Sequence, residues 1–95
     1  MPYIAQEDRP LLDKLALTLA SALHEPKLAG KLNYTITSLI DHLYLNRPFG
    51  YTELNTIVGV LECVKLELYR RVGAPYEDEK KKENGDVYEN LSPEP

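Results

Sequence analysis

The residues of this chain that could bind a ligand lie in its second half, on one predicted helix and just after it. Cationic side chains bind phosphate and carboxylate groups, and arginine does so with a planar fork of donors. Aromatic rings beside such cations offer a wall on which a flat ligand can stack. These residue types therefore predict a pocket for a small anionic ligand. The candidate ligand-binding residues are Lys65, Tyr69, Arg70, Arg71 and Tyr76, with Asn55 and Glu62 as supporting polar residues.

A simpler structural interpretation exists for the same residues. Glu62, Lys65 and Tyr69 follow a spacing of three and four residues, so they share one ridge of a helix. The stem of Lys65 can cover apolar surface while its ammonium group reaches water or Glu62. Arg70 and Arg71 close the same predicted helix, where cations suit the helix dipole. The sequence alone leaves both interpretations open.

Residues for catalysis or metal binding do not form a recognisable pattern. His24 and His42 have no ligand partners at a known zinc spacing, and Cys63 has no obvious histidine partner. All-helical nucleotide pyrophosphatases use clustered glutamates to hold magnesium, but Glu62 and Glu67 are five residues apart and face different ways. We therefore expect no enzyme, no catalytic residue, no metal and no cofactor.

Composition narrows the class of protein. A chain of 95 residues fits one domain, which we expect over residues 1–88, with a flexible tail over residues 89–95. The net charge of −4 opposes bulk nucleic-acid binding, which needs many cationic contacts to phosphates. No apolar run is long enough to span a bilayer, and the N-terminus does not read as a signal peptide. A single cysteine fits a reducing compartment, so we expect a cytoplasmic protein.

Hydrophobic periodicity predicts helices over residues 9–24, 33–45 and 52–72, and a short charged helix over 75–84. Asp8 and Thr52 are the expected N-caps, and Gly73 is the expected C-cap of the third helix. Gly85 is expected to stop the short helix. The predicted fold class is all-α, a compact three- to four-helix bundle with a long central third helix and a short charged C-terminal helix or tail.

With Val60 and Tyr69 added, the apolar stripe of the third predicted helix covers about half its circumference, more than one flat contact needs. Either this helix is central, or part of its face meets another subunit, so we expect a homo-oligomer. Three further apolar side chains fall on faces predicted to be exposed, and these are candidate interface residues. The stripe is Leu54, Ile57, Val58, Leu61, Val64, Leu68 and Val72, and the candidate interface residues are Leu17, Tyr34 and Leu45.

Several motifs spread over most of the chain are distinctive: Leu-Asn-Tyr-Thr-Ile-Thr at 32–37, Val-Gly-Val-Leu-Glu-Cys-Val-Lys-Leu-Glu at 58–67, Tyr-Arg-Arg at 69–71, Ala-Pro-Tyr-Glu-Asp at 74–78 and Glu-Asn-Gly-Asp-Val-Tyr at 83–88. With them the chain resembles a family of small proteins of unknown function found largely in bacteriophage genomes. The resemblance implies a phage or prophage origin and the cytoplasm of a bacterial host. It implies no established activity, and it assigns no catalytic residue.

Three functions fit these observations. The first is a homo-oligomeric helical module that sequesters a small anionic ligand, such as a nucleotide signal of host defence. The second is a protein–protein inhibitor or adaptor of a host protein. The third is a helix-turn-helix regulator in which Thr52, Asn55 and Thr56 reach bases, although Glu53 and the acidic balance oppose DNA.

Overall fold

A computed structural model describes residues 2–91 of the chain, and these residues form helices and turns without a strand. Along the sequence follow the short 3-10 turn η1 (Gln6–Asp8), α1 (Pro10–Ala22), α2 (Leu28–Leu43), α3 (Tyr51–Leu68), the π-helical turn η2 (Tyr69–Gly73) and α4 (Ala74–Asn84). The predicted all-helical class is confirmed. The chain divides into two units, Met1–Gly59 and Val60–Pro95, which are described separately. None of the described helices is long and apolar enough to cross a membrane.

Helix α1 begins one residue later than predicted and ends at Ala22. Pro10 occupies the first turn, where its missing N–H costs no hydrogen bond. Asp8 is not the N-cap, because it belongs to η1 and no side chain caps this helix. Arg9 fixes the entry instead: its Nε and Nη2 atoms donate to the Ile4 carbonyl oxygen at 3.0 and 2.8 Å.

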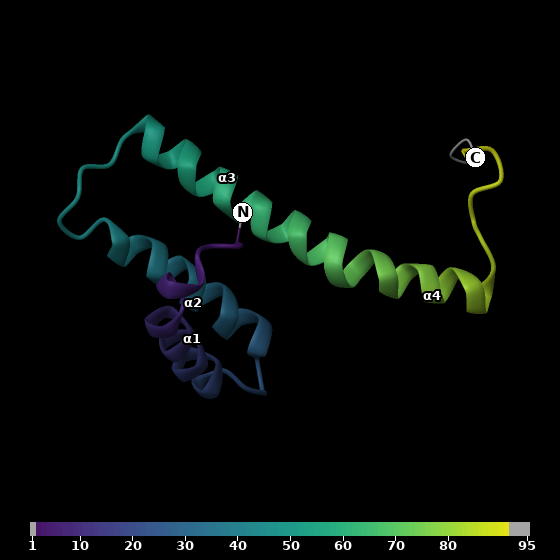
Figure 1. Cartoon of the computed structure of the whole chain (residues 1–95), viewed down its shortest axis with the longest axis horizontal. Helices are drawn as coiled ribbons and strands as arrows, with labels where there is room; N and C mark the ends of the chain where they lie inside the picture. Colours follow the sequence, from purple (N-terminus) through teal and green to yellow (C-terminus); the bar gives the residue numbers. More distant parts are fainter. Residues whose placement is uncertain (1, 92–95) are drawn as a thin grey trace. The chain divides into compact units, whose positions relative to one another are not determined.

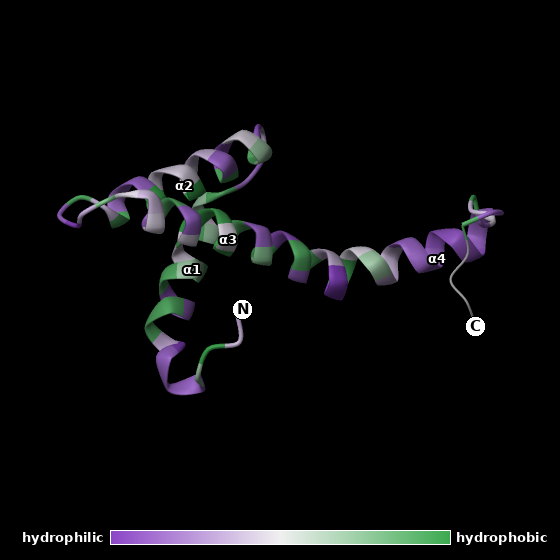
Figure 2. Ribbon diagram, turned by 90° about the horizontal axis from the view of Figure 1, so that it is seen from above, coloured by the Kyte–Doolittle hydropathy of each residue, from purple (hydrophilic) through white to green (hydrophobic). Residues whose placement is uncertain are grey.

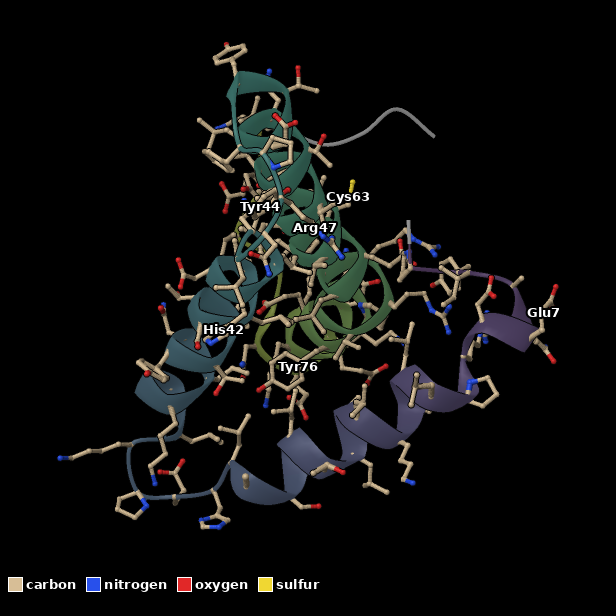
Figure 3. All side chains as sticks on the ribbon, turned by 90° about the vertical axis from the view of Figure 1, so that its left-hand side faces the viewer. Glu7, His42, Tyr44, Arg47, Cys63 and Tyr76 are labelled. Atoms are coloured by element: carbon tan, nitrogen blue, oxygen red, sulfur yellow. The ribbon has the colours of Figure 1, made fainter. Side chains whose placement is uncertain are left out.

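Helix α2 begins at Leu28, five residues before the predicted start. The connection from α1 is short, with a cis peptide bond between Glu25 and Pro26 and a left-handed Lys27 at φ 66°. Gly30 lies inside the helix, since an isolated glycine weakens a helix without ending it. The two helices diverge from this connection (Figures 1 and 3), and they do not pack along their lengths.

Helix α3 begins at Tyr51, so Thr52 is not its N-cap. The carbonyl oxygen of Gly50 accepts the first helical bond from the Leu54 N–H at 3.1 Å. The side chain of Glu53 reaches back, and its Oε2 accepts the Gly50 N–H at 3.0 Å. This is the second half of a capping box, with glycine in place of serine or threonine at the cap. Before it, the rings of Tyr44 and Phe49 meet edge to face at 5.1 Å and close the turn.

In the second unit the helix does not stop at Gly73, which contradicts the predicted C-cap. Gly73 keeps right-handed helical angles, φ −66° and ψ −49°, and Figure 1 shows the ribbon continuing through η2 into α4. Pro75 has no N–H and its ring crowds the preceding turn of an α-helix. The chain widens into a π turn there, in which the Ala74 N–H donates to the Tyr69 carbonyl oxygen. The two predicted helices are therefore one run of helix with a π turn inside it.

Helix α4 ends where the sequence predicted, at Gly85, whose φ of 89° suits glycine alone. Figure 2 shows α4 to be strongly hydrophilic. Its charges pair along the helix, Lys82 with Glu79 at 3.5 Å and Lys80 with Glu83 at 3.2 Å. The predicted flexible tail begins at Glu89, and its last four residues, 92–95, lie outside the described residues.

No side chain among the described residues is buried in either unit. The apolar stripes of the helices have no helix of the same unit packed along them, so the predicted bundle is not present within either unit. On α2, the apolar residues Leu32, Ile36 and Leu43 are 45, 40 and 41% exposed, and Leu39 is 55% exposed. Hydrophobic burial is the main driving force of folding, and neither unit by itself provides it for these apolar faces.

Candidate functional site

The predicted ligand-binding residues of the second unit lie on α3, η2 and α4. Lys65 points along its own helix, with its Nζ atom 3.1 Å from Glu62 Oε1. This is the simpler of the two interpretations drawn from the sequence. Both side chains are more than half exposed, so the pair contributes at most about 1 kcal/mol. Lys65 is not locked by this pair and remains able to meet a partner.

Arg70 is held by Glu67 through two hydrogen bonds, from Nε to Oε2 at 3.1 Å and from Nη2 to Oε1. Glu67 is the better covered partner, with its side chain 24% exposed. Arg70 and Arg71 follow each other, so their side chains leave the helix about 100° apart. The two arginine side chains therefore start from different sides of this helix.

Tyr76 is separated from Tyr69 by seven residues, a spacing that places both rings on one face of a regular α-helix. The π turn between them holds an extra residue, so it rotates the later side chain away from that face. Lys80 lies 5.6 Å from the centroid of the Tyr76 ring, in cation–π range. The rings of Tyr69 and Tyr76 thus lie on different faces of the helix.

The remaining supporting residue, Asn55, lies in the first unit. Two shallow, solvent-open depressions are found on the first unit around Gly30 and Tyr34 of α2. None of the residues proposed for the ligand lines either of them. The second unit thus presents the candidate ligand residues along a helix surface and not around a cavity.

His42 makes a local contact on its own helix, and Cys63 is exposed. His42 Nδ1 lies 2.7 Å from the Ser38 carbonyl oxygen, one turn back on α2. Cys63 is exposed, and Figure 3 shows its sulfur projecting away from α3. Among residues 2–91 no group of three histidine, cysteine, aspartate or glutamate side chains could hold a metal ion.

The main feature of the surface is apolar. Along α3 and η2, apolar side chains recur every four and then three residues, which is the seam of a coiled coil. The lysine of the candidate ligand set, Lys65, occupies one of these seam positions. The sequence carried this signal, because the alternation is visible in the spacing alone. The seam positions are Leu54, Val58, Leu61, Lys65, Leu68 and Val72, and all of them are exposed.

The candidate interface residues chosen from the sequence are exposed too. Leu17, Tyr34 and Leu45 show 70, 73 and 76% of their surface. The stripe residues are exposed as well, so exposure does not single out these three. The apolar faces as a whole, and not three isolated residues, form the candidate interface.

A protein-family comparison matches residues 1–87, nearly the whole chain. The family is described as a domain of unknown function, DUF6899. The chain belongs to this family. The resemblance to a family of unknown function is thereby confirmed at that level, and the family description names no activity and no site. No curated protein matches the chain. No solved structure matches it.

Proposed function

We propose that this protein is a non-enzymatic, homo-oligomeric helical binding module, in which copies of the chain cover one another's apolar faces. The observation that carries the proposal is the absence of any buried side chain among the described residues, together with exposed leucines, isoleucines and valines on α1, α2 and α3. Monomeric soluble proteins rarely expose large continuous apolar surfaces. The bundle expected from the sequence is then formed between copies.

The oligomer would act on its target by contact, as an inhibitor or adaptor of a bacterial host protein. This role fits the resemblance to phage-borne proteins and needs no catalytic residue. Sequestration of an anionic ligand, the first expectation from the sequence, remains a second candidate. One observation favours it: Lys65 stays exposed and lies beside the ring-bearing residue Tyr69 on one ridge. A pocket for the ligand would then have to be completed by a second copy.

Native mass spectrometry of gently purified protein tests the proposal. We expect the mass of an integral number of chains, each 10.8 kDa. A discrete added mass of nucleotide size would favour sequestration over contact inhibition. A single chain at micromolar concentration, in a folded state, would contradict the proposed homo-oligomer.

A further inference from the structure

From the seam on α3 we infer that a second copy of this chain occupies it, in antiparallel orientation about a two-fold axis near Cys63. The inference rests on the proposed homo-oligomer and states which face associates and how. The two-fold pair can exist by itself or within a larger even-numbered assembly. Three features of the helix lead to it: the length of the seam, the charge within it and the residues that lie off the seam.

The seam is long enough to join two helices. It runs over 19 residues, which spans about 27 Å of helix. Its apolar members in the second unit, Leu61, Leu68 and Val72, are 42, 61 and 60% exposed. Among the described residues of that unit, the main contacts of α4 are with the adjoining turn η2, so α4 does not pack along this face. A helix with the same four-and-three spacing fits this surface, and a second copy supplies one.

The charge at Lys65 decides the orientation. In a parallel pair each seam residue meets its own counterpart, so two Lys65 ammonium groups would face each other. Like charges in contact are unfavourable, and more so away from water. In an antiparallel pair, each seam residue faces a different seam residue of the other copy. With the two-fold axis near residue 63, Lys65 faces Leu61 of the other copy. Glu62 of that copy is the adjacent residue, so each lysine gains a carboxylate across the seam.

The residues opposite the seam agree with this arrangement. Cys63 and Arg70 lie on the outer side of the helix, seven residues apart, and Arg70 is paired with Glu67 there. Leu66 also lies off the seam, about 200° around the helix from Leu68. It is 56% exposed, close to the 61% of Leu68. The two leucines therefore form a matched pair, one on the proposed contact and one off it.

The first test compares Leu68→Glu with Leu66→Glu by sedimentation equilibrium of the full chain. We expect Leu68→Glu to raise the dissociation constant by about 100-fold or more, because a leucine is lost on both copies. Leu66→Glu should change it only a few-fold. Equal effects of the two substitutions would overturn the inference.

The second test measures orientation in the unmodified seam, so that it holds even if Leu68→Glu does not fold. A spin label is placed on native Cys63 in one sample and on Lys81→Cys, in a Cys63→Ser background, in another. The two positions are about 27 Å apart along the helix. An antiparallel pair with its axis near residue 63 gives an interchain distance at residue 81 that exceeds the one at residue 63 by more than about 25 Å. Equal distances at both positions mean a parallel pair and overturn the inference.

These outcomes separate the two proposals. A monomeric unmodified chain removes both the homo-oligomer and this interface. An oligomer with equal label distances, or one insensitive to Leu68→Glu, leaves the homo-oligomer standing and removes only the antiparallel seam.

Discussion

The ring of Tyr69 lies against the backbone of Gly73, so closely that a Cβ atom at residue 73 would be 2.7 Å from the Cδ2 atom of the ring. Real Cβ atoms do not approach other atoms this closely. Glycine at residue 73 therefore makes room for an aromatic side chain one turn before it. The same glycine precedes Pro75 at the π turn, where the helix widens.

Substitution of Gly73 by alanine should not raise the free energy of unfolding, although the same substitution inside a helix usually does. Alanine is favoured over glycine inside a helix by about 1 kcal/mol. In Gly73→Ala we expect this gain to be cancelled or reversed, because the Tyr69 ring must move. In the Tyr69→Ala background the same change should stabilise by about 1 kcal/mol. Urea denaturation of the unmodified protein, Gly73→Ala, Tyr69→Ala and the double variant measures the effect of Gly73→Ala on the free energy of unfolding in each background.

Gly59→Ala provides the control for this experiment. A Cβ atom at Gly59 has no atom within 4 Å, and the residue lies inside α3. We expect it to raise the free energy of unfolding by about 0.5–1 kcal/mol. If Gly59→Ala and Gly73→Ala have the same effect, the ring at Tyr69 does not explain the glycine at residue 73.

The cap of α3 should depend on a single carboxylate. Glu53 Oε2 accepts the Gly50 N–H at 3.0 Å. Glu53→Ala should lower the free energy of unfolding by about 1 kcal/mol, as the loss of a capping side chain does. Glu53→Gln keeps an acceptor oxygen and should recover most of this loss. Equal thermal denaturation midpoints for all three proteins would show that this hydrogen bond does not stabilise the helix.

Pro75 should be the cause of the π turn. With Pro75→Ala, the N–H donor returns and the ring crowding disappears, so residues 69–73 can revert to α-helix. We expect slower amide hydrogen exchange over η2 and a higher free energy of unfolding, by up to about 3 kcal/mol. Pro48→Ala, in the turn before α3, is the control and should leave exchange over η2 unchanged. Unchanged exchange over residues 69–73 in Pro75→Ala would contradict this origin of the turn.

Much of the local structure could be predicted from the sequence, because it depends on neighbours along the chain. The helical class and the stop at Gly85 both follow from patterns over a few residues. The prediction of Thr52 as the N-cap was wrong, because α3 begins one residue earlier and the Glu53 carboxylate accepts the Gly50 N–H at its start. The stop at Gly73 was wrong because a glycine followed closely by proline usually ends a helix, and here a π turn absorbs the proline.

The candidate site was harder to predict, because it depends on where side chains point. Spacing correctly placed Lys65 beside Glu62. The five proposed ligand residues do not surround a cavity within the second unit, since successive residues diverge and the π turn changes the direction of Tyr76. Packing between distant segments has no local signature in the sequence, and neither does the choice between packing within a chain and packing between chains.

Lys65 should set the antiparallel orientation of the pair and at the same time make its association weaker than an apolar residue would. A polar residue at a seam position specifies register at a cost in stability. We expect Lys65→Leu to lower the dissociation constant by about tenfold or more, or to change the number of chains in the assembly. Lys80→Leu on α4, away from the seam, is the control. Weaker association of Lys65→Leu, measured by sedimentation equilibrium, would contradict a place for Lys65 in the interface.

The most direct measurement of the central claim is helicity and thermal midpoint against protein concentration, with the mass followed by analytical ultracentrifugation on the same samples. If copies of the chain supply one another's hydrophobic core, the midpoint should rise with concentration, and dilution should release chains and lose helix together. A mass of 10.8 kDa at every concentration, with a sharp midpoint that does not move, would contradict the claim, because such a chain buries its apolar faces alone.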